Sequence, residues 1–566
     1  MPQSIPVPST GFQALILCGP GVSLNTFTAN PEEHPKCLVP VANRPMVYYA
    51  IDFLRRSGIS DITLITPPSS LAPLQAALKQ NPHLTSFSSP SPSVLAPKAL
   101  EMTMGTCELL RLPEVQACIK TDFLLLPCDL ICEIPGESLL EAWMVSQSSL
   151  GGSLVPEGRN AHGPITRGSG GERGGRRGGL GLYYQTKLRE ESVKGEATDF
   201  VAIAPLDKDE APAVSHPAQG PAALRFSLSK VVMSSPMDTI KEKMENDKGF
   251  LIRHSLVKEH AEIKMLSSYR DAHLYVFPYW IKDLARNEKL ESVSEDLIGY
   301  WAKSGWQKGL ADKLGITEIF ERQQDSQIPG ETGSHDNESV EEEIDLQAMS
   351  TTKSGSINAE SALPSYASRV KVSEAEASKD KKSSKVPPIL AYVQRESAPF
   401  VRRVDSSALL LSTSLRLAKL PSIEEVGRIE ASPFAHNQKI AHPEGIAQRC
   451  TVSKSDCLIA ENVTVEQFAV IKESVIGSNC HISSGARLTR CVLMDGVTVG
   501  PKATLTNCII GRRAKIGAES MLKECEVQDS YVVPEDTDSK NEKFMFFEGL
   551  DEEAGMTDDN EDDMEL

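Results

Sequence analysis

The sequence predicts an α/β domain followed by a parallel β-helix, and two observations support this fold class. Near the N-terminus, a short apolar run, a turn with two glycines and an amphipathic segment follow one another, which is the pattern of a βαβ unit. Near the C-terminus, aliphatic residues recur at regular steps of six and seventeen. Residues 326–387 lie between the two patterns and are rich in Ser, Glu, Lys and Ala, so they predict a disordered linker.

The first βαβ unit can be followed along the chain. Residues 14–18 form an apolar run suited to a strand that is buried on both faces. Gly19 and Gly21 follow, where the backbone must turn tightly and can approach a phosphate group. Pro45 then opens a segment with apolar residues at helical spacing, and a second strand follows it. Two glycines alone indicate only a turn, so the chemistry depends on the residues around them.

A second motif follows the glycine turn and is much more specific. Residues 35–46 read Pro-Lys-Cys-Leu-Val-Pro-Val-Ala-Asn-Arg-Pro-Met. This run resembles the signature of the sugar-1-phosphate nucleotidyltransferases, and the resemblance implies a Rossmann-like α/β domain of their type. The glycine loop departs from that signature, because Ser23 stands where the family has its catalytic Arg and Thr26 stands where a Pro is usual. The loop is also one residue short.

The resemblance identifies five candidate positions for binding a nucleotide or phosphate: Gly19, Gly21, Lys36, Gly105 and Asp129. In the family, an Asp at the end of a buried strand binds a metal, as Asp129 would. A Gly-Thr pair like the one at Gly105 lies near the bound nucleotide. Without the resemblance, Asp129 is an ordinary strand-end residue and Lys36 is a solvated loop lysine. We interpret all five as relic binding positions.

Loss of the arginine predicts loss of the ancestral chemistry. Nucleotidyl transfer depends on positive charges and metal ions that neutralise phosphates in the transition state. Replacing a guanidinium with the hydroxyl of Ser23 removes a full charge and a bidentate donor. The removal of one such contact costs about 2.7–4 kcal/mol of transition-state stabilisation. The sequence therefore predicts no catalytic residues, no bound metal and no cofactor in a degenerate nucleotidyltransferase-type domain.

The C-terminal repeat predicts a parallel β-helix over residues 445–535. Within a group the aliphatic residues are six apart, and successive groups begin seventeen apart. Each group therefore builds one coil with three short faces, and the coils stack at about 4.8 Å around an aliphatic core. The coils of hexapeptide proteins in the resembled family are left-handed, so the resemblance implies that handedness. The repeat positions are Ile459, Val465, Ile471, Ile476, Ile482, Leu488, Leu493, Val499, Leu505, Ile510, Ile516, Leu522, Val527 and Val533.

A column of small residues accompanies the repeat, two positions before each group begins. A zinc site is one interpretation of its cysteines, but no histidine or Cys-x-x-Cys pair accompanies them. Small buried side chains with reduced thiols are the better interpretation. The column consists of Cys457, Ser474, Cys491, Cys508 and Cys525.

Several other segments are distinctive in composition. A flexible insertion is predicted over about 151–228, because nine glycines and four arginines lie between Gly163 and Gly181. Such a tract can contact RNA, but a flexible surface loop is the favoured interpretation.

Residues 544–566 hold ten acids and no Lys or Arg, which predicts a disordered acidic tail. His273 lies in an alternating aromatic stretch, so a packed strand histidine is favoured over a catalytic one.

These features divide the 566 residues into an α/β domain over 12–320, the linker, a connecting segment over 389–440, the β-helix and the tail. No run approaches the ~20 apolar residues that a membrane span needs. The N-terminus lacks the basic and apolar regions of a signal peptide. With twelve cysteines that form no disulfide pattern, these observations predict a cytosolic protein.

A nucleotidyltransferase-like domain followed by hexapeptide repeats is also the domain order of two subunits of eukaryotic translation initiation factor 2B, gamma and epsilon. The missing arginine favours this family, and residues 104–111, 120–131, 271–275 and 474–482 resemble the gamma type. The resemblance implies a non-catalytic subunit that supports epsilon in GDP/GTP exchange. It also implies that the partners are epsilon, the other subunits and the GTPase initiation factor 2, without a membrane. A GDP-sugar pyrophosphorylase and a relic-pocket nucleotide or sugar-phosphate sensor remain as alternatives.

Overall fold

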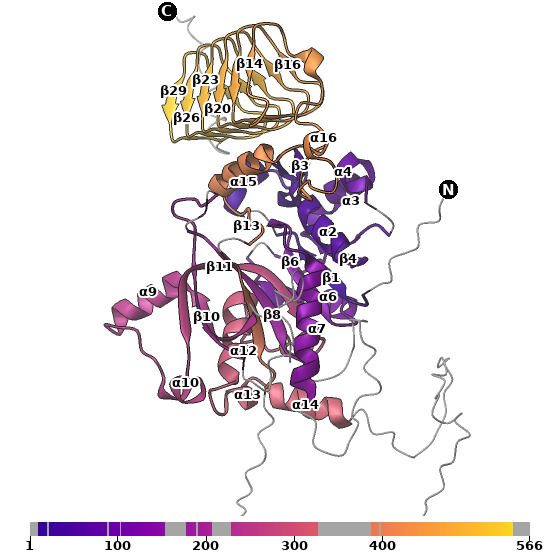
Figure 1. Cartoon of the computed structure of the whole chain (residues 1–566), viewed down its shortest axis with the longest axis vertical. Helices are drawn as coiled ribbons and strands as arrows, with labels where there is room; N and C mark the ends of the chain where they lie inside the picture. The colour runs from indigo at the N-terminus through magenta and orange to yellow at the C-terminus, as the bar shows by residue number, and fades with distance from the viewer. Residues whose placement is uncertain are drawn as a thin grey trace, which may run out of the picture.

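The computed structural model describes residues 10–19, 22–87, 90–101, 103–152, 177–187, 189, 191–206, 228–325, 386–395 and 398–546. Gly21, the predicted linker up to residue 385 and most of the predicted acidic tail lie outside these ranges. Figure 1 shows the α/β domain below and the β-helix above, with helix α15 (Ser407–Lys419) between them.

The α/β domain is built on a mixed sheet. Its nine described strands follow the order β5-β4-β1-β6-β11-β8-β12-β10-β9. The first four are parallel to one another, and the chain reverses its direction of winding between β1 and β6. Open α/β sheets bind ligands at such a point, at the carboxyl ends of the strands. The strands are β1 (Gln13–Leu17), β4 (Asp61–Ile65), β5 (Ser93–Leu95), β6 (Phe123–Pro127), β8 (Gly179–Gln185), β9 (Asp199–Ala204), β10 (Leu228–Pro236), β11 (Lys264–Phe277) and β12 (Ile389–Val393).

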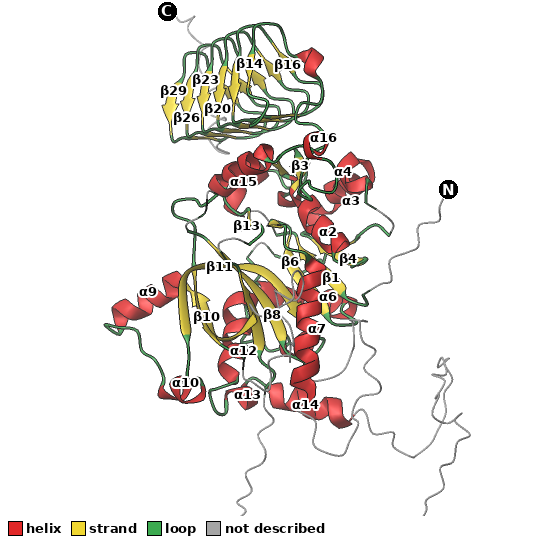
Figure 2. Cartoon of the chain, in the orientation of Figure 1, coloured by secondary structure: helices red, strands yellow, loops and turns green. Residues whose placement is uncertain are grey.

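Both faces of this sheet are buried, which explains why its parallel strands are continuous apolar runs. In β1, Ala14 and Ile16 enter one hydrophobic core, whereas Leu15 enters the core on the opposite face. Figure 2 shows helices on both sides of the strands. The helices of this domain are α1 (Asn25–Thr28), α2 (Met46–Arg56), α3 (Leu71–Gln80), α4 (Pro82–Thr85), α5 (Thr106–Arg111), α6 (Pro113–Cys118), α7 (Gly136–Gly152), α9 (Met237–Asn246), α10 (His254–Glu259), α11 (Ile281–Leu284), α12 (Ile298–Ser304), α13 (Leu310–Lys313) and α14 (Ile316–Asp325). Within the described ranges, none of the helices combines the length and apolar character needed to cross a bilayer.

Two boundaries expected from the sequence are wrong. Residues 389–440 do not merely connect the domains, since β12 lies inside the central sheet and β13 (Val401–Arg403) pairs with β7 (Leu130–Cys132). The predicted insertion over 151–228 likewise contains the sheet strands β8 and β9. These strands find their partners far away in the chain, so no local pattern reveals them. The α/β domain therefore continues through α15.

The C-terminal region is a parallel β-helix, as the repeat predicts. Paired residues are nineteen apart between β14 and β17 and seventeen apart between the later strands of each sheet, for example Ile459 with Ile476 and Ile476 with Leu493. All fourteen predicted aliphatic positions lie in its core. Its three sheets are β14 (Thr451–Val452), β17 (Val470–Lys472), β20 (Arg487–Thr489), β23 (Thr504–Thr506), β26 (Met521–Lys523) and β29 (Asp538–Lys540); β15 (Leu458–Ile459), β18 (Val475–Ile476), β21 (Val492–Leu493), β24 (Ile509–Ile510), β27 (Glu526–Val527) and β30 (Lys543–Phe544); and β16 (Thr464–Val465), β19 (His481–Ile482), β22 (Thr498–Val499), β25 (Lys515–Ile516) and β28 (Val532–Val533).

The β-helix extends beyond the predicted bounds at both ends. It begins with isolated bridges from Ile440 to Ile459 and from Ile446 to Val465, so the first step is nineteen residues instead of seventeen. At the other end, Val527 pairs with Phe544 in β30. The longer first step breaks the periodicity, which is why the sequence pattern missed the start.

The cysteine column is buried, as expected from its position in the repeat. Its five side chains are 0–1% exposed, and all twelve cysteines of the chain are free thiols. The Cys508 thiol donates to the carbonyl oxygens of Thr506 and Leu522, each at 3.3 Å. The thiols therefore satisfy backbone groups inside the narrow coil.

Candidate functional site

A buried carboxylate with two cations lies at the carboxyl end of β6. Asp129 is 0% exposed. Its Oδ2 accepts from Lys36 Nζ at 2.6 Å, and Lys36 opens the short 3-10 turn Lys36–Leu38. Arg403, the last residue of β13, donates from Nε to Oδ1 at 3.2 Å and from Nη2 to Oδ2 at 3.4 Å. Both carboxylate oxygens of Asp129 are thus bonded to positive side chains.

The electrostatics of this group favour the ionised carboxylate. Burial alone would raise the pKa of Asp129, but the charges of Arg403 and Lys36 outweigh burial and hold that pKa well below its usual value. Burial likewise lowers the pKa of Lys36, but the Asp129 charge produces a net increase. The three groups therefore stay charged together over the physiological pH range.

A second layer of charges surrounds Arg403. Its Nη2 lies 3.8 Å from Asp405 Oδ2, and Arg270 Nη2 donates to the same oxygen at 2.5 Å. Arg270 also lies 3.8 Å from Glu196. The fully buried Arg402 lies 4.0 Å from the same Glu196, so the ion network extends well beyond Asp129.

His273 lies beside this network at an irregular point of β11. The register of β11 against β8 shifts between Asp271 and Tyr275, and His273 takes a φ of 53° there. Burial and the charge of Arg403 lower the pKa of His273 well below its usual value, so the imidazole is neutral. His273 is therefore a packed strand histidine, as expected from the sequence, and it lies at an irregular point of the strand.

Another backbone segment of the chain, at Glu291, packs directly against Gly105. The amides of Cys107 and Glu108, at the start of α5, point at the carbonyl oxygen of Glu291 at 2.9 and 3.4 Å. A Cβ atom on Gly105 would lie 2.3 Å from that same oxygen. Glycine is needed here for close packing of two backbone segments, and this packing uses the first amides of α5.

The described part of the glycine loop is open to solvent. Gly19 is exposed, and an added Cβ would meet no atom within 4 Å. Ser23, in the place of the catalytic Arg, is exposed as well. Of the five relic candidates, the structure brings Lys36 and Asp129 together.

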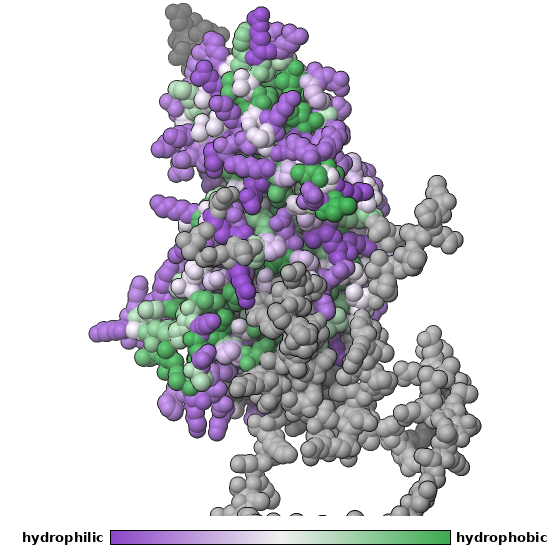
Figure 3. All heavy atoms as spheres, in the orientation of Figure 1, coloured by the Kyte–Doolittle hydropathy of each residue, from purple (hydrophilic) through white to green (hydrophobic). Residues whose placement is uncertain are grey.

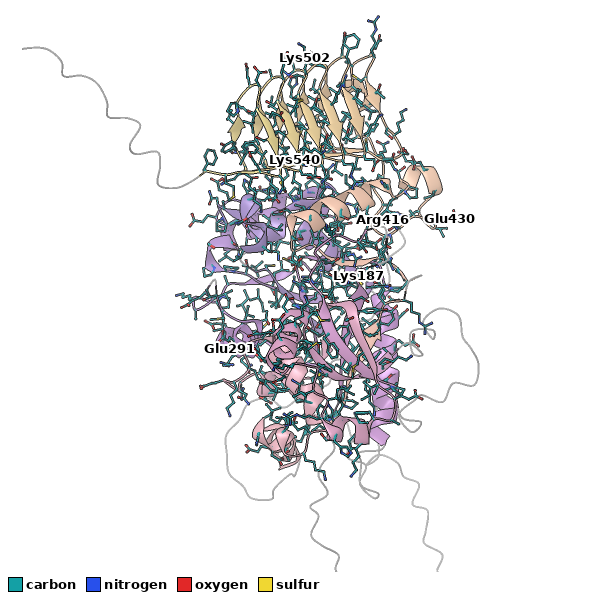
Figure 4. The ribbon with its side chains drawn as sticks, turned by 90° about the vertical axis from the view of Figure 1, so that its left-hand side faces the viewer. Lys187, Glu291, Arg416, Glu430, Lys502 and Lys540 are labelled. Carbon is teal, nitrogen blue, oxygen red and sulfur yellow. The ribbon has the colours of Figure 1, made fainter. Side chains whose placement is uncertain are left out.

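The glycine loop and the signature residues 35–46 contact the β-helix. Thr26 Oγ1 donates to Glu526 Oε2 at 3.0 Å, and Asn43 Nδ2 donates to the Ile476 carbonyl at 2.9 Å. Arg512 Nη2 donates to the Leu38 carbonyl at 2.7 Å. Figure 4 shows α15, with Arg416 labelled, directly beneath the β-helix beside this contact. We call this the loop–helix interface.

Sequence reasoning missed Arg403, Arg270 and Asp405. Arg403 and Asp405 fall in the segment interpreted as a connector, where no motif marks a functional residue. The one local signal was a pair of arginines after an apolar residue at the end of a short β-type run, and such pairs are common on surfaces. Only the pairing of β13 with β7 brings Arg403 to Asp129.

Comparison with known proteins agrees with the C-terminal architecture. Residues 436–538 match a family model described as the EIF2B subunit epsilon LbH domain, where LbH denotes a left-handed β-helix. Over 350 residues the chain is 24% identical to translation initiation factor eIF2B subunit gamma of Schizosaccharomyces pombe, with 61% of each chain covered. Over 288 residues it is 21% identical to eIF2B subunit gamma of Caenorhabditis elegans, with 50% of this chain and 56% of the relative covered. The matched regions span less than two thirds of either relative. In sequence, the chain is similar to the gamma subunits of eIF2B, and its C-terminal domain matches the model of an eIF2B-type left-handed β-helix.

Proposed function

We propose that this chain is a non-catalytic, gamma-type subunit of the cytosolic guanine-nucleotide exchange factor for initiation factor 2, and that it supports an epsilon-type subunit. We further propose that its α/β domain is a degenerate nucleotidyltransferase. The observation that carries the first proposal is the sequence similarity to eIF2B gamma subunits, and the pairing of Asp129 with Lys36 and Arg403 supports the second.

Magnesium chemistry at Asp129 would require a cation to leave. Mg²⁺ takes oxygen ligands and needs close access to the carboxylate. Removing one partner from a buried ion pair costs about 3–5 kcal/mol, because an uncompensated charge stays behind. Ser23 supplies no positive charge at the position where the resembled family has its catalytic Arg. Both observations support loss of nucleotidyl transfer.

The loop–helix interface supports a scaffolding role. Exchange on a GTPase requires a surface that favours the nucleotide-free state over the loaded state, which is a binding task rather than bond chemistry. In this chain the glycine loop and the signature residues hold the two domains together through Thr26, Asn43 and Arg512. A fixed angle between the domains gives partners a defined surface to bind.

Reconstitution tests the proposal. The full chain would be co-expressed with an epsilon-type subunit, and GDP release from initiation factor 2 would be measured with epsilon alone, the chain alone and both together. We expect stable co-purification, faster release with both than with epsilon alone, and no acceleration by the chain alone. Purification of the chain alone or only with itself would contradict the proposal.

A second assay addresses the alternative functions. The purified chain would be incubated with Mg²⁺, pyrophosphate and GDP-sugars, and we expect no nucleoside triphosphate to form. Turnover would instead support a pyrophosphorylase. Tight nucleotide or sugar-phosphate binding without turnover would support a sensor.

A further inference from the structure

An apolar groove lies on the α/β domain, and none of the residues that line it belongs to the Asp129 cluster. It has a volume of about 280 Å³ and is bordered by β9, β10, α12 and the loop that leads into α10. Pockets for drug-sized ligands hold about 300–1,000 Å³, so this groove suits the side chains of a peptide better than a whole nucleotide. Phe200 and Trp306 form its buried floor.

The rim of the groove is unusually apolar for a surface. Figure 3 shows green, apolar atoms gathered at the lower left of the molecule, in the area of α9 and α10. Contiguous apolar surface of this kind marks an interaction site. The exposed rim side chains are Leu251 at 74%, Ile252 at 47%, Met265 at 43% and Tyr300 at 38%.

The charges of the groove have one sign. Its two charged lining residues, Arg253 and Lys303, are both cations. Burial, together with the charges of Lys243 and Arg253, lowers the pKa of Lys303. Carboxylates in an occupant would compensate this positive charge, so the groove favours a segment that combines aliphatic and acidic side chains.

The chain itself contains such a segment outside the described residues. Residues 338–350 read Glu-Ser-Val-Glu-Glu-Glu-Ile-Asp-Leu-Gln-Ala-Met-Ser, with five acids, and no Lys or Arg lies between Arg322 and Lys353. We propose that residues 338–350 bind in the groove, with Ile344 and Leu346 entering its apolar floor and the acids facing Arg253 and Lys303.

The intervening chain leaves from α14, which packs against α13, and it returns next to α12. Leu310 lines the groove, and the described chain ends soon after it at Asp325. The chain returns at Val386, where the Pro387 carbonyl accepts from Trp301 Nε1 at 2.8 Å, next to the rim residue Tyr300. The residues between Asp325 and residue 338 can reach roughly 40 Å when extended. A segment on a tether of this reach binds its own chain at a high effective concentration.

Photocrosslinking in the full chain tests the proposal. A benzophenone amino acid would replace Tyr300 at the rim, and mass spectrometry would identify the crosslinked peptide. Phe468, an exposed aromatic residue of the β-helix, is the matched control position. We expect the Tyr300 probe to capture residues 338–350 of the same molecule and the Phe468 probe not to do so. Mixing isotopically heavy and light chains separates capture within one molecule from capture between two.

A pair of linker variants makes the test specific. Ile344→Asp with Leu346→Asp should reduce the crosslink at least about fivefold, because it removes the apolar anchors. Val370→Asp with Val372→Asp, farther along the same linker, should leave the crosslink unchanged. Capture of a second copy, of another protein or of a different segment would overturn the proposal, and so would the absence of any crosslink from the Tyr300 probe.

Discussion

The ammonium group of Lys36 lies 2.6 Å from Oδ2 of the buried Asp129. The contact joins the signature turn after β1 to the residue that follows β6, and Arg403 completes it from β13. One carboxylate therefore connects three segments that are far apart in the chain. This relationship makes Asp129 a structural residue.

Replacement of Asp129 should be strongly destabilising. Asp129→Asn removes the carboxylate charge that Lys36 and Arg403 share and leaves Arg403 only the 3.8 Å contact with Asp405, and breaking a buried ion pair costs about 3–5 kcal/mol. Urea denaturation would measure the free energy of unfolding of both proteins. The control is Asp238→Asn, because the Asp238–Lys241 pair lies at the surface and contributes about 0–1 kcal/mol. A loss below about 1 kcal/mol for Asp129→Asn would contradict the structural role.

The loop–helix interface should depend on Arg512. Arg512→Ala removes the bond to the Leu38 carbonyl and the contact with His34, at a cost of about 1.5–3 kcal/mol for a hydrogen bond from a charged group. Hydrogen exchange should then become faster in the amides of residues 34–46. Arg513→Ala is the matched control, since the neighbouring Arg513 is exposed. Equal hydrogen-exchange rates of these amides in Arg512→Ala and Arg513→Ala would contradict a stabilising role of Arg512 at the interface.

The repeat was predictable residue by residue, whereas much of the α/β sheet was not. Ile459, Ile476 and Leu493 form one row because every coil repeats the same local geometry. Even the corners repeat, since Asn462, Asn479, Gly496, Arg513 and Ser530 all take a positive φ at intervals of seventeen residues. In a β-helix each coil contacts only the coils next to it, so the residues that pack together recur at a fixed spacing that can be read in the sequence.

Strand β12 illustrates the opposite case. Its five residues pair with β8 and β10, which are distant in sequence, and nothing local distinguishes it from a connector. The candidate site had the same limitation. Lys36 and Asp129 could be identified from the family resemblance, but Arg403 reaches Asp129 only because β13 pairs with β7. Long-range pairing therefore limited both predictions.

Gly105 and Gly19 should respond differently to the same substitution. Gly105→Ala places a Cβ 2.3 Å from the Glu291 carbonyl, so backbone must move, and such overpacking costs about 1–3 kcal/mol. Gly19→Ala meets open space and should change the free energy of unfolding by less than about 0.5 kcal/mol. Thermal unfolding of the two variants would measure the difference. Equal melting temperatures would show that the contact between α5 and Glu291 is not rigid.

The cysteine column should tolerate serine but not leucine. Ser474 occupies the same place one coil before Cys491, and its hydroxyl donates to the Lys472 carbonyl. Cys508→Ser can donate to Thr506 and Leu522 in the same way, so we expect a loss below about 1 kcal/mol. Cys508→Leu overfills the narrow coil and should cost about 1–3 kcal/mol or more. Chemical denaturation would measure the free energy of unfolding of both variants. A larger loss for Cys508→Ser than for Cys508→Leu would contradict the tight packing of the column.

Asp271 should make the chain less stable as the pH rises. Burial, with the nearby Asp199 charge, raises the pKa of Asp271 to about 7, whereas an unfolded Asp has a pKa of about 3.9. The folded state therefore holds the proton more tightly. The stabilisation that this proton provides is fully present below about pH 4 and is lost as the pH rises through 7.

Asp271→Asn isolates this effect, because the amide does not titrate. Each pKa unit corresponds to about 1.4 kcal/mol, so the free energy of unfolding of the wild type should fall by up to about 4 kcal/mol relative to the variant between pH 4 and pH 8. Urea denaturation at several pH values would measure the difference between the two proteins. A difference that stays constant with pH would mean that Asp271 is already ionised in the folded state. In that case the hydrogen bonds that Asp271 accepts from the Tyr275 hydroxyl and the His273 amide, at 2.6 and 2.8 Å, would outweigh the effect of burial.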